Sequence, residues 1–147
     1  MEKEVLVSIK GLQFVEGEGP NEVETINKGQ YYIKDGKHYI LFEEVMEEYK
    51  VPIKNMIKLS DTTCSVNKKG PINVNMLFDR EHKNMTNYVT PFGTILIGID
   101  THKMDLVISE DQIKVYIEYA LEANYEHLSN CKLTIVIKSC SKGISLT

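Results

Sequence analysis

Alternation of apolar and polar residues constrains this chain more than any other feature of its sequence. The clearest run has an apolar side chain at every second position: Ile113, Val115, Ile117, Tyr119 and Leu121. Successive side chains of a β-strand point to opposite faces, so such a run predicts a strand with one buried face. Similar runs occupy residues 5–9, 72–78, 95–99 and 133–137. We therefore expect a β-rich protein.

Turn-forming residues separate these runs. Asp35-Gly36 lies between two short aromatic-rich runs, and this dipeptide favours a two-residue β-hairpin. Residues 17–21, 69–71 and 91–93 combine glycine with proline, which is also typical of turns. Turns spaced about ten residues apart indicate an antiparallel meander of roughly eight to ten strands.

Two segments also carry helical features. In residues 109–128, Ser109 and Gln112 have the spacing of a capping box at the start of a helix. The segment also contains apolar residues at helical spacing. The alternation described above and the β-branched residues there favour a strand instead. Residues 42–50 contain good helix formers, but like charges lie four apart in that segment, which disfavours a helix. A strand end, a turn and a single helical turn all remain open for it.

A sheet with one apolar face must close on itself or stack on another sheet. Because no convincing helix is available to cover it, a barrel or a sandwich remains, and closure into a barrel also removes the exposed strand edges. The sequence has neither internal repeats nor a linker. We predict a single all-β domain over residues 1–147, an antiparallel meander closed into a barrel.

Composition argues against several kinds of partner. The net charge is −4 and Arg80 is the only arginine, so we expect no nucleic-acid partner. No apolar run reaches 18 residues and no secretory signal precedes the first strand, so we expect no membrane association. Three cysteines, Cys64, Cys131 and Cys140, are expected to be reduced thiols of a cytoplasmic protein.

The order of these segments resembles that of the YwiB-like family, small uncharacterised bacterial proteins with a calycin-type (lipocalin-like) barrel. The resemblance is carried by Lys28–Ile40 with Phe42–Glu44, by Met76–Phe78, by Tyr88–Ile95 and by Ile117–Glu122. It implies a lipocalin-like barrel for nearly the whole chain. The matching features are turn glycines, aromatic pairs and alternating strands, so the resemblance implies no activity and no functional residues.

No residue pattern in the chain supports a catalytic centre, a metal site or a cofactor. His127 and Cys131 are four residues apart, a spacing that on a strand covers about 13 Å, too far to share one metal ion. Gly17 and Gly19 lack the ending of a phosphate-binding loop. The acidic residues between 43 and 48 lack the spacing of a calcium-binding loop.

The tyrosines are the most suggestive residues for function. The chain has eight tyrosines and no tryptophan, and four tyrosines fall in or beside predicted strands: Tyr31, Tyr39, Tyr88 and Tyr119. A tyrosine combines an apolar ring with one polar group, which suits the lining of a pocket at a barrel end. We therefore expect a binding module for a small, neutral or weakly charged, apolar or amphipathic ligand. Alternatives are a filled barrel that acts through contacts with a partner protein and, less favoured, an enzyme with polar groups at the barrel mouth.

Overall fold

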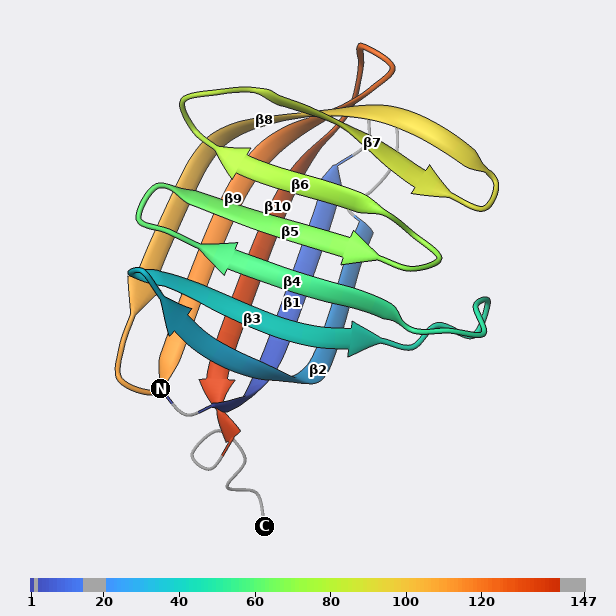
Figure 1. Cartoon of the computed structure of the whole chain (residues 1–147). Coiled ribbons are helices and arrows are strands. Elements are labelled where there is room, and N and C mark those ends of the chain that lie inside the picture. The colour runs from blue at the N-terminus through green and yellow to red at the C-terminus, as the bar shows by residue number, and fades with distance from the viewer. Residues whose placement is uncertain (2, 15–20, 141–147) are drawn as a thin grey trace.

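Ten antiparallel strands form the protein, and the computed structural model describes residues 1, 3–14 and 21–140 (Figure 1). Along the chain they are β1 (Glu4–Phe14), β2 (Asn21–Lys34), β3 (Lys37–Glu44), β4 (Ile53–Leu59), β5 (Thr63–Lys69), β6 (Val74–Asp79), β7 (Asn84–Thr90), β8 (Gly93–Ile108), β9 (Gln112–Ala123) and β10 (Glu126–Ser139). The predicted all-β fold is therefore confirmed.

The strands follow one another around a barrel that is closed at nine of its ten junctions. The order in the sheet is β6-β5-β4-β3-β2-β1-β10-β9-β8-β7, so the first and last strands pair with each other. Between β6 and β7, the described residues form a single bridge, in which Asn73 and Val89 exchange two backbone hydrogen bonds of 2.9 Å each. The predicted meander is confirmed as a nearly closed barrel.

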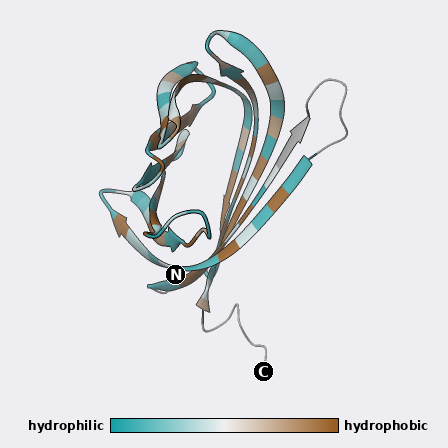
Figure 2. Cartoon of the chain, turned by 90° about the vertical axis from the view of Figure 1, so that its right-hand side faces the viewer, coloured by the Kyte–Doolittle hydropathy of each residue, from teal (hydrophilic) through white to brown (hydrophobic). Residues whose placement is uncertain are grey.

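Two walls face each other across the interior. In Figure 1, β3–β6 run across the front and β1, β8, β9 and β10 run steeply behind them, while β2 bends from one wall into the other. We call β3–β6 with residues 28–34 of β2 the front wall, and β1, β8, β9 and β10 the back wall. Gly29 lies where β2 pairs with both β1 and β3, and a Cβ atom there would sit only 2.7 Å from the carbonyl oxygen of Leu41. The walls are seen edge-on in Figure 2, where hydrophobic and hydrophilic residues alternate along the strands.

Side chains fill the middle of the barrel. The alternating residues of β9 point inward, and Ile113, Val115 and Ile117 are fully buried, which confirms a strand rather than a helix there. The largest fully buried side chains come from both walls: Phe78, Ile40, Ile53, Ile57, Leu59, Ile99, Ile113, Ile117, Ile135, Ile137, Val5 and Val7. A void large enough for a ligand would leave accessible surface on the atoms around it. These side chains therefore pack against one another rather than around a cavity.

The turns agree with the sequence where the structure describes them. Asp35 and Gly36 adopt φ values of 52° and 76° and connect β2 to β3, as a two-residue hairpin requires. Strand β3 extends to Glu44, and a turn in which the Tyr49 amide donates to the Met46 carbonyl follows, at 3.1 Å. The predicted turn at residues 17–21 falls mostly outside the described residues. Among the described residues, no helix is long and apolar enough to cross a membrane.

Candidate functional site at one end of the barrel

Strands β4 and β5 place polar side chains on the inner face of the barrel. Along β4, Ile53, Asn55, Ile57 and Leu59 point inward, and Asn55 is only 3% exposed. Lys68 occupies an inward position on β5, directly opposite Asn55 in the strand register. An amide and an ammonium group therefore lie where the pattern of the neighbouring strands would place aliphatic side chains.

Glu44, Asn55 and Lys68 form a hydrogen-bonded polar triad. The Asn55 side-chain amide donates to Glu44 Oε1 at 2.8 Å, and the Lys68 ammonium donates to the same oxygen at 2.5 Å. Lys68 also donates to Asn55 Oδ1 at 2.8 Å. The side chains of Lys68 and Glu44 are 24% and 20% exposed. The triad is therefore mostly withdrawn from water but still reachable from one end of the barrel.

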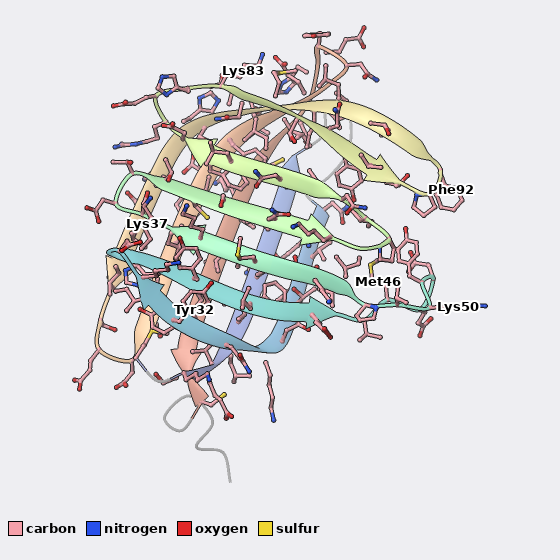
Figure 3. The ribbon with its side chains drawn as sticks, in the orientation of Figure 1. Tyr32, Lys37, Met46, Lys50, Lys83 and Phe92 are labelled. Carbon is pink, nitrogen blue, oxygen red and sulfur yellow. The ribbon has the colours of Figure 1, made fainter. Side chains whose placement is uncertain are left out.

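Two tyrosines and a connecting loop surround the triad. Tyr88 points inward from β7, and burial, followed by the charges of Tyr49 and Glu44, raises its pKa. Met46 and Tyr49, from the loop between β3 and β4, pack against the core and cover this end. Figure 3 places Met46 and Lys50 at the same end of the barrel as Phe92, which lies in the turn between β7 and β8.

The rim of this end carries exposed apolar side chains beside the exposed charges of Glu47, Glu48 and Lys50. Val45 and Val51 in the loop after β3 are 87% and 58% exposed, and Phe92 is 91% exposed. Beneath the rim, the triad offers a carboxylate, an ammonium and an amide, which together both donate and accept hydrogen bonds and carry no net charge. The arrangement combines apolar contact area with a few oriented polar groups, as ligand sites generally do.

The structure does not gather the four tyrosines expected to line a pocket. Tyr88 lies beside the triad, whereas the Tyr31 hydroxyl shares a hydrogen bond of 2.7 Å with His38 Nδ1 near the β2–β3 hairpin. Tyr39 is on the outer face, because its neighbours Ile40 and Phe42 are the buried ones. Tyr119 contacts Phe78 edge-on, with ring centroids 4.9 Å apart, inside the barrel.

A second group of buried polar residues surrounds Tyr119. Burial, followed by the neighbouring Cys131, raises the pKa of Tyr119. The Cys131 thiol shares a hydrogen bond of 3.3 Å with the Ser129 hydroxyl. Thr101, which pairs with Tyr119 in the register, is 3% exposed. All these groups lie in β8, β9 and β10, whereas the polar triad lies in β3, β4 and β5.

The cysteines and histidines lie apart. Cys64, Cys131 and Cys140 are all unpaired. His127 is exposed while Cys131 is buried, so the pair that we considered as metal ligands does not share one environment. Within the described part of the chain, no group of three His, Cys, Asp or Glu residues is placed to hold a metal ion.

Comparison with known proteins agrees with this architecture. The sequence matches the model of a domain family of unknown function, DUF1934, over residues 7–135. The chain belongs to this family. It is 26% identical over 137 residues to the uncharacterised beta-barrel protein YwiB of Bacillus subtilis, an alignment that covers 91% of this chain and 95% of that protein. The crystal structure of the B. subtilis ywiB protein superposes with a TM-score of 0.82 and 19% identity, covering 93% of this chain and 92% of the other. The resemblance to YwiB-like proteins is confirmed, and neither comparison names a function for this family.

Sequence reasoning missed the polar triad. In the sequence, Glu44 stands in an acidic run and Lys68 beside a predicted turn, and nothing there predicted that the two would meet Asn55. The signal was present, because Ile53, Ile57 and Leu59 keep a two-residue period that Asn55 interrupts. An isolated polar residue inside an otherwise apolar period therefore marks this site.

Proposed function

We propose that this protein is a binding module for a small, neutral or weakly charged, amphipathic molecule, which it takes at the barrel end built around Glu44, Asn55 and Lys68. The observation that carries the proposal is the hydrogen-bonded polar triad on the inner face of an otherwise apolar barrel. Withdrawing an ion pair from water costs free energy, and well-packed apolar residues in its place are often at least as stabilising. A ligand that uses these groups gives a reason for their presence.

The shape of the interior limits where such a ligand lies. The middle of the barrel is filled by fully buried side chains, so the ligand binds at the end and does not run through the centre. Its polar part meets the triad and Tyr88, and its apolar part meets the rim formed by Val45, Val51 and Phe92. The opposite charges of Glu44 and Lys68 favour a neutral or zwitterionic molecule over an anion.

We also propose that the protein works in the cytoplasm without catalysing a reaction. Its three thiols are unpaired, which suits a reducing compartment. Lys68 is the triad's only potential nucleophile, and its ammonium group is held in an ion pair with Glu44 rather than free to attack a substrate. Binding is therefore the role that these side chains support best.

A filled barrel that acts on a partner protein is the second candidate. It is favoured by the same solid interior and by the exposed rim, since exposed apolar patches often mark contact surfaces. In that case Phe92 and Val45 would meet the partner, and the triad would fix the conformation of the loop between β3 and β4.

Titration with Nile red, a neutral dye that fluoresces in apolar surroundings, tests the first candidate. We expect saturable binding of one dye per chain to the native protein. Tyr88→Leu should weaken dye binding about tenfold or more, because the phenol hydroxyl and part of the ring surface next to the triad are lost. Tyr116→Leu is the matched control, because Tyr116 lies on the outer face of β9, and it should leave the affinity unchanged.

Circular dichroism establishes that both variants are folded. Native mass spectrometry of freshly purified protein adds a second reading, because a co-purifying small molecule would support the binding module. Absence of saturable dye binding, or equal losses in the two variants, would overturn this candidate and leave the partner-binding barrel in its place.

A further inference from the structure

The outer face of the front wall carries an excess of positive charge. Outward positions alternate with the buried ones along each strand, so their occupants follow from the burial pattern. We call the lysines among them the lysine face: Lys28, Lys34, Lys37, Lys54, Lys58 and Lys69. Over residues 28–34 of β2 and all of β3, β4 and β5, Glu43 is the only acidic residue at an outward position. The net charge of −4 hides this separation of charge.

Several lysines of this face lie next to one another, and Lys54 alone among them is also directly opposite a carboxylate, that of Glu43 in the β3–β4 ladder. Lys54 and Lys69 are directly opposite each other in the β4–β5 ladder, and Lys34 and Lys37 pair across the β2–β3 hairpin. Like charges in such positions destabilise a sheet. None of the six forms an ion pair with another described residue. On the back wall, by contrast, acidic and basic residues mix, as in the Lys103–Asp105 pair at 3.8 Å. A bound anion would relieve the repulsion on the lysine face.

Two tyrosines stack among these lysines. The rings of Tyr32 and Tyr39, opposite each other on β2 and β3, are parallel within 4° with centroids 4.9 Å apart. The Lys58 ammonium lies 5.7 Å from the centroid of Tyr39. Tyr32 is 41% exposed, and Figure 3 shows it on the front wall together with Lys37. The stack therefore presents aromatic surface between positive charges.

A groove lies on the same face. It has a volume of about 780 Å³, and Lys28, Gln30, Leu41, Glu43 and Lys54 are among the residues that line it. The groove thus offers two ammonium groups, two side-chain amides, the carboxylates of Glu4 and Glu43, and apolar side chains. A ligand that suits the groove carries hydrogen-bonding groups of both kinds together with apolar parts, while the lysines outside the groove favour negative charge.

We propose that the lysine face binds single-stranded RNA. Phosphates would meet the lysines, a base would stack on Tyr32, and base amino groups would donate to Glu43. The carboxylate side chains of an acidic peptide supply negative charge but, unlike nucleotides, do not bring a flat ring with each charge to the tyrosine stack. Outward amide and hydroxyl groups, such as those of Gln30, Ser65 and Asn67, both donate and accept hydrogen bonds and so match a ribose 2′-hydroxyl.

This inference departs from the expectation drawn from the net charge. That expectation averages the charge over both walls. A bound RNA strand meets the charges of only one wall within the screening length of about 8–10 Å. The scarcity of arginine excludes bidentate clamps on phosphate but leaves lysine as a point-charge ligand. The groove includes Asn55 of the polar triad, but the variants that test this proposal change Tyr32, Lys54 and Lys58, which lie outside the triad, so its failure can be distinguished from failure of ligand binding there.

Fluorescence anisotropy with a labelled 12-nucleotide oligouridine tests the proposal. We expect saturable binding that weakens with salt, with a log–log slope of about −2 to −4 if three to six phosphates are neutralised. Lys54→Glu with Lys58→Glu should weaken binding at least about tenfold, because two phosphate contacts become repulsive. Lys114→Glu with Lys138→Glu makes the same charge change on the outer face of the back wall and should alter binding less than about twofold.

Tyr32→Ala separates RNA from other anions. It should weaken oligouridine binding about fivefold or more through loss of stacking, while any binding of polyglutamate stays unchanged. Thermal unfolding establishes that every variant is folded. Equal losses in the front-wall and back-wall variants, no effect of Tyr32→Ala, or polyglutamate binding as tight as that of RNA would overturn the proposal. Equal affinity for the matching oligodeoxynucleotide would overturn the assignment to RNA.

Discussion

Glu44 and Lys68 are two charged residues that the fold withdraws from water. Each is about four-fifths withdrawn from solvent, and each depends on the other and on Asn55 for hydrogen bonds. A partly buried charge without a partner costs more than the pair contributes. The two residues should therefore behave as a unit in mutagenesis.

Removing Lys68 alone should destabilise the fold more than removing both charges. We expect Lys68→Met to lower the free energy of unfolding by about 2–3 kcal/mol, because Glu44 keeps its charge and loses a donor. Adding Glu44→Gln should restore at least about 1 kcal/mol. Urea unfolding at pH 7 measures both. Lys103→Met, which removes one partner of an exposed pair, is the control and should cost less than about 1 kcal/mol. A Lys68→Met variant as stable as this control would contradict the prediction.

Cys64 should make the protein sensitive to alkaline pH. Burial raises the pKa of its thiol to about 12, from 9.0 in the unfolded chain. Between these pH values the unfolded chain releases a proton that the folded protein retains, so unfolding becomes more favourable as the pH rises above about 9. Urea midpoints at pH 8 and pH 10.5 should show this loss, and Cys64→Val should reduce it. An equal loss in the variant would show that other groups cause it.

Apart from β2 and β3, which the Asp35-Gly36 turn indicated, the strands can be recognised from the sequence only where their inward positions are uniformly apolar. Strand β9 and the buried halves of β1, β6, β8 and β10 satisfy that condition, so alternation predicted them. In β4 and β5 the inward residues Asn55 and Lys68 interrupt it, so the two strands that carry the candidate site were not predicted. The site was missed for the same physical reason, because its polar groups break the pattern that reveals strands.

One hairpin also escaped prediction. Asn124 and Tyr125 connect β9 to β10 with φ values of 52° and 69°, a turn that needs two residues in the left-handed region. Asparagine tolerates this conformation, but tyrosine is not a residue that signals it. The pairing of β9 with β10 on both sides of the turn imposes the conformation that the local sequence does not favour.

The orientation of β9 is testable by a pair of charge changes. Ile117 is fully buried between β8 and β10, so Ile117→Lys should cost more than about 3 kcal/mol by burying an unpaired charge. Lys114→Glu changes an exposed outward position of the same strand and should stay within about 0.5 kcal/mol. The urea midpoints of the two variants measure these losses of stability. Equal shifts would be incompatible with the observed strand.

At the scale of the whole molecule, the barrel depends on one long-range pairing. Strands β1 and β10 come from opposite ends of the chain and pair from Val5 with Ser139 to Phe14 with Asn130. This ladder joins strands β1–β6 to strands β7–β10 in one sheet, while the β6–β7 junction has a single bridge. The covalent link in the middle of the sequence therefore crosses the weakest junction of the fold.

A chain cut in its middle should consequently remain one particle. Arg80, the only arginine, lies in the exposed turn between β6 and β7, so a protease specific for arginine cleaves the chain once, at that turn. The two fragments, residues 1–80 and 81–147, would stay associated through the β1–β10 ladder and keep the circular dichroism of the intact protein. Native mass spectrometry should detect them as a single complex. Separation of the halves without denaturant would show that the mid-chain connection is essential. The natural site at which to divide this protein into two complementing pieces is therefore the centre of its sequence, where the barrel has its only open seam among the described strands.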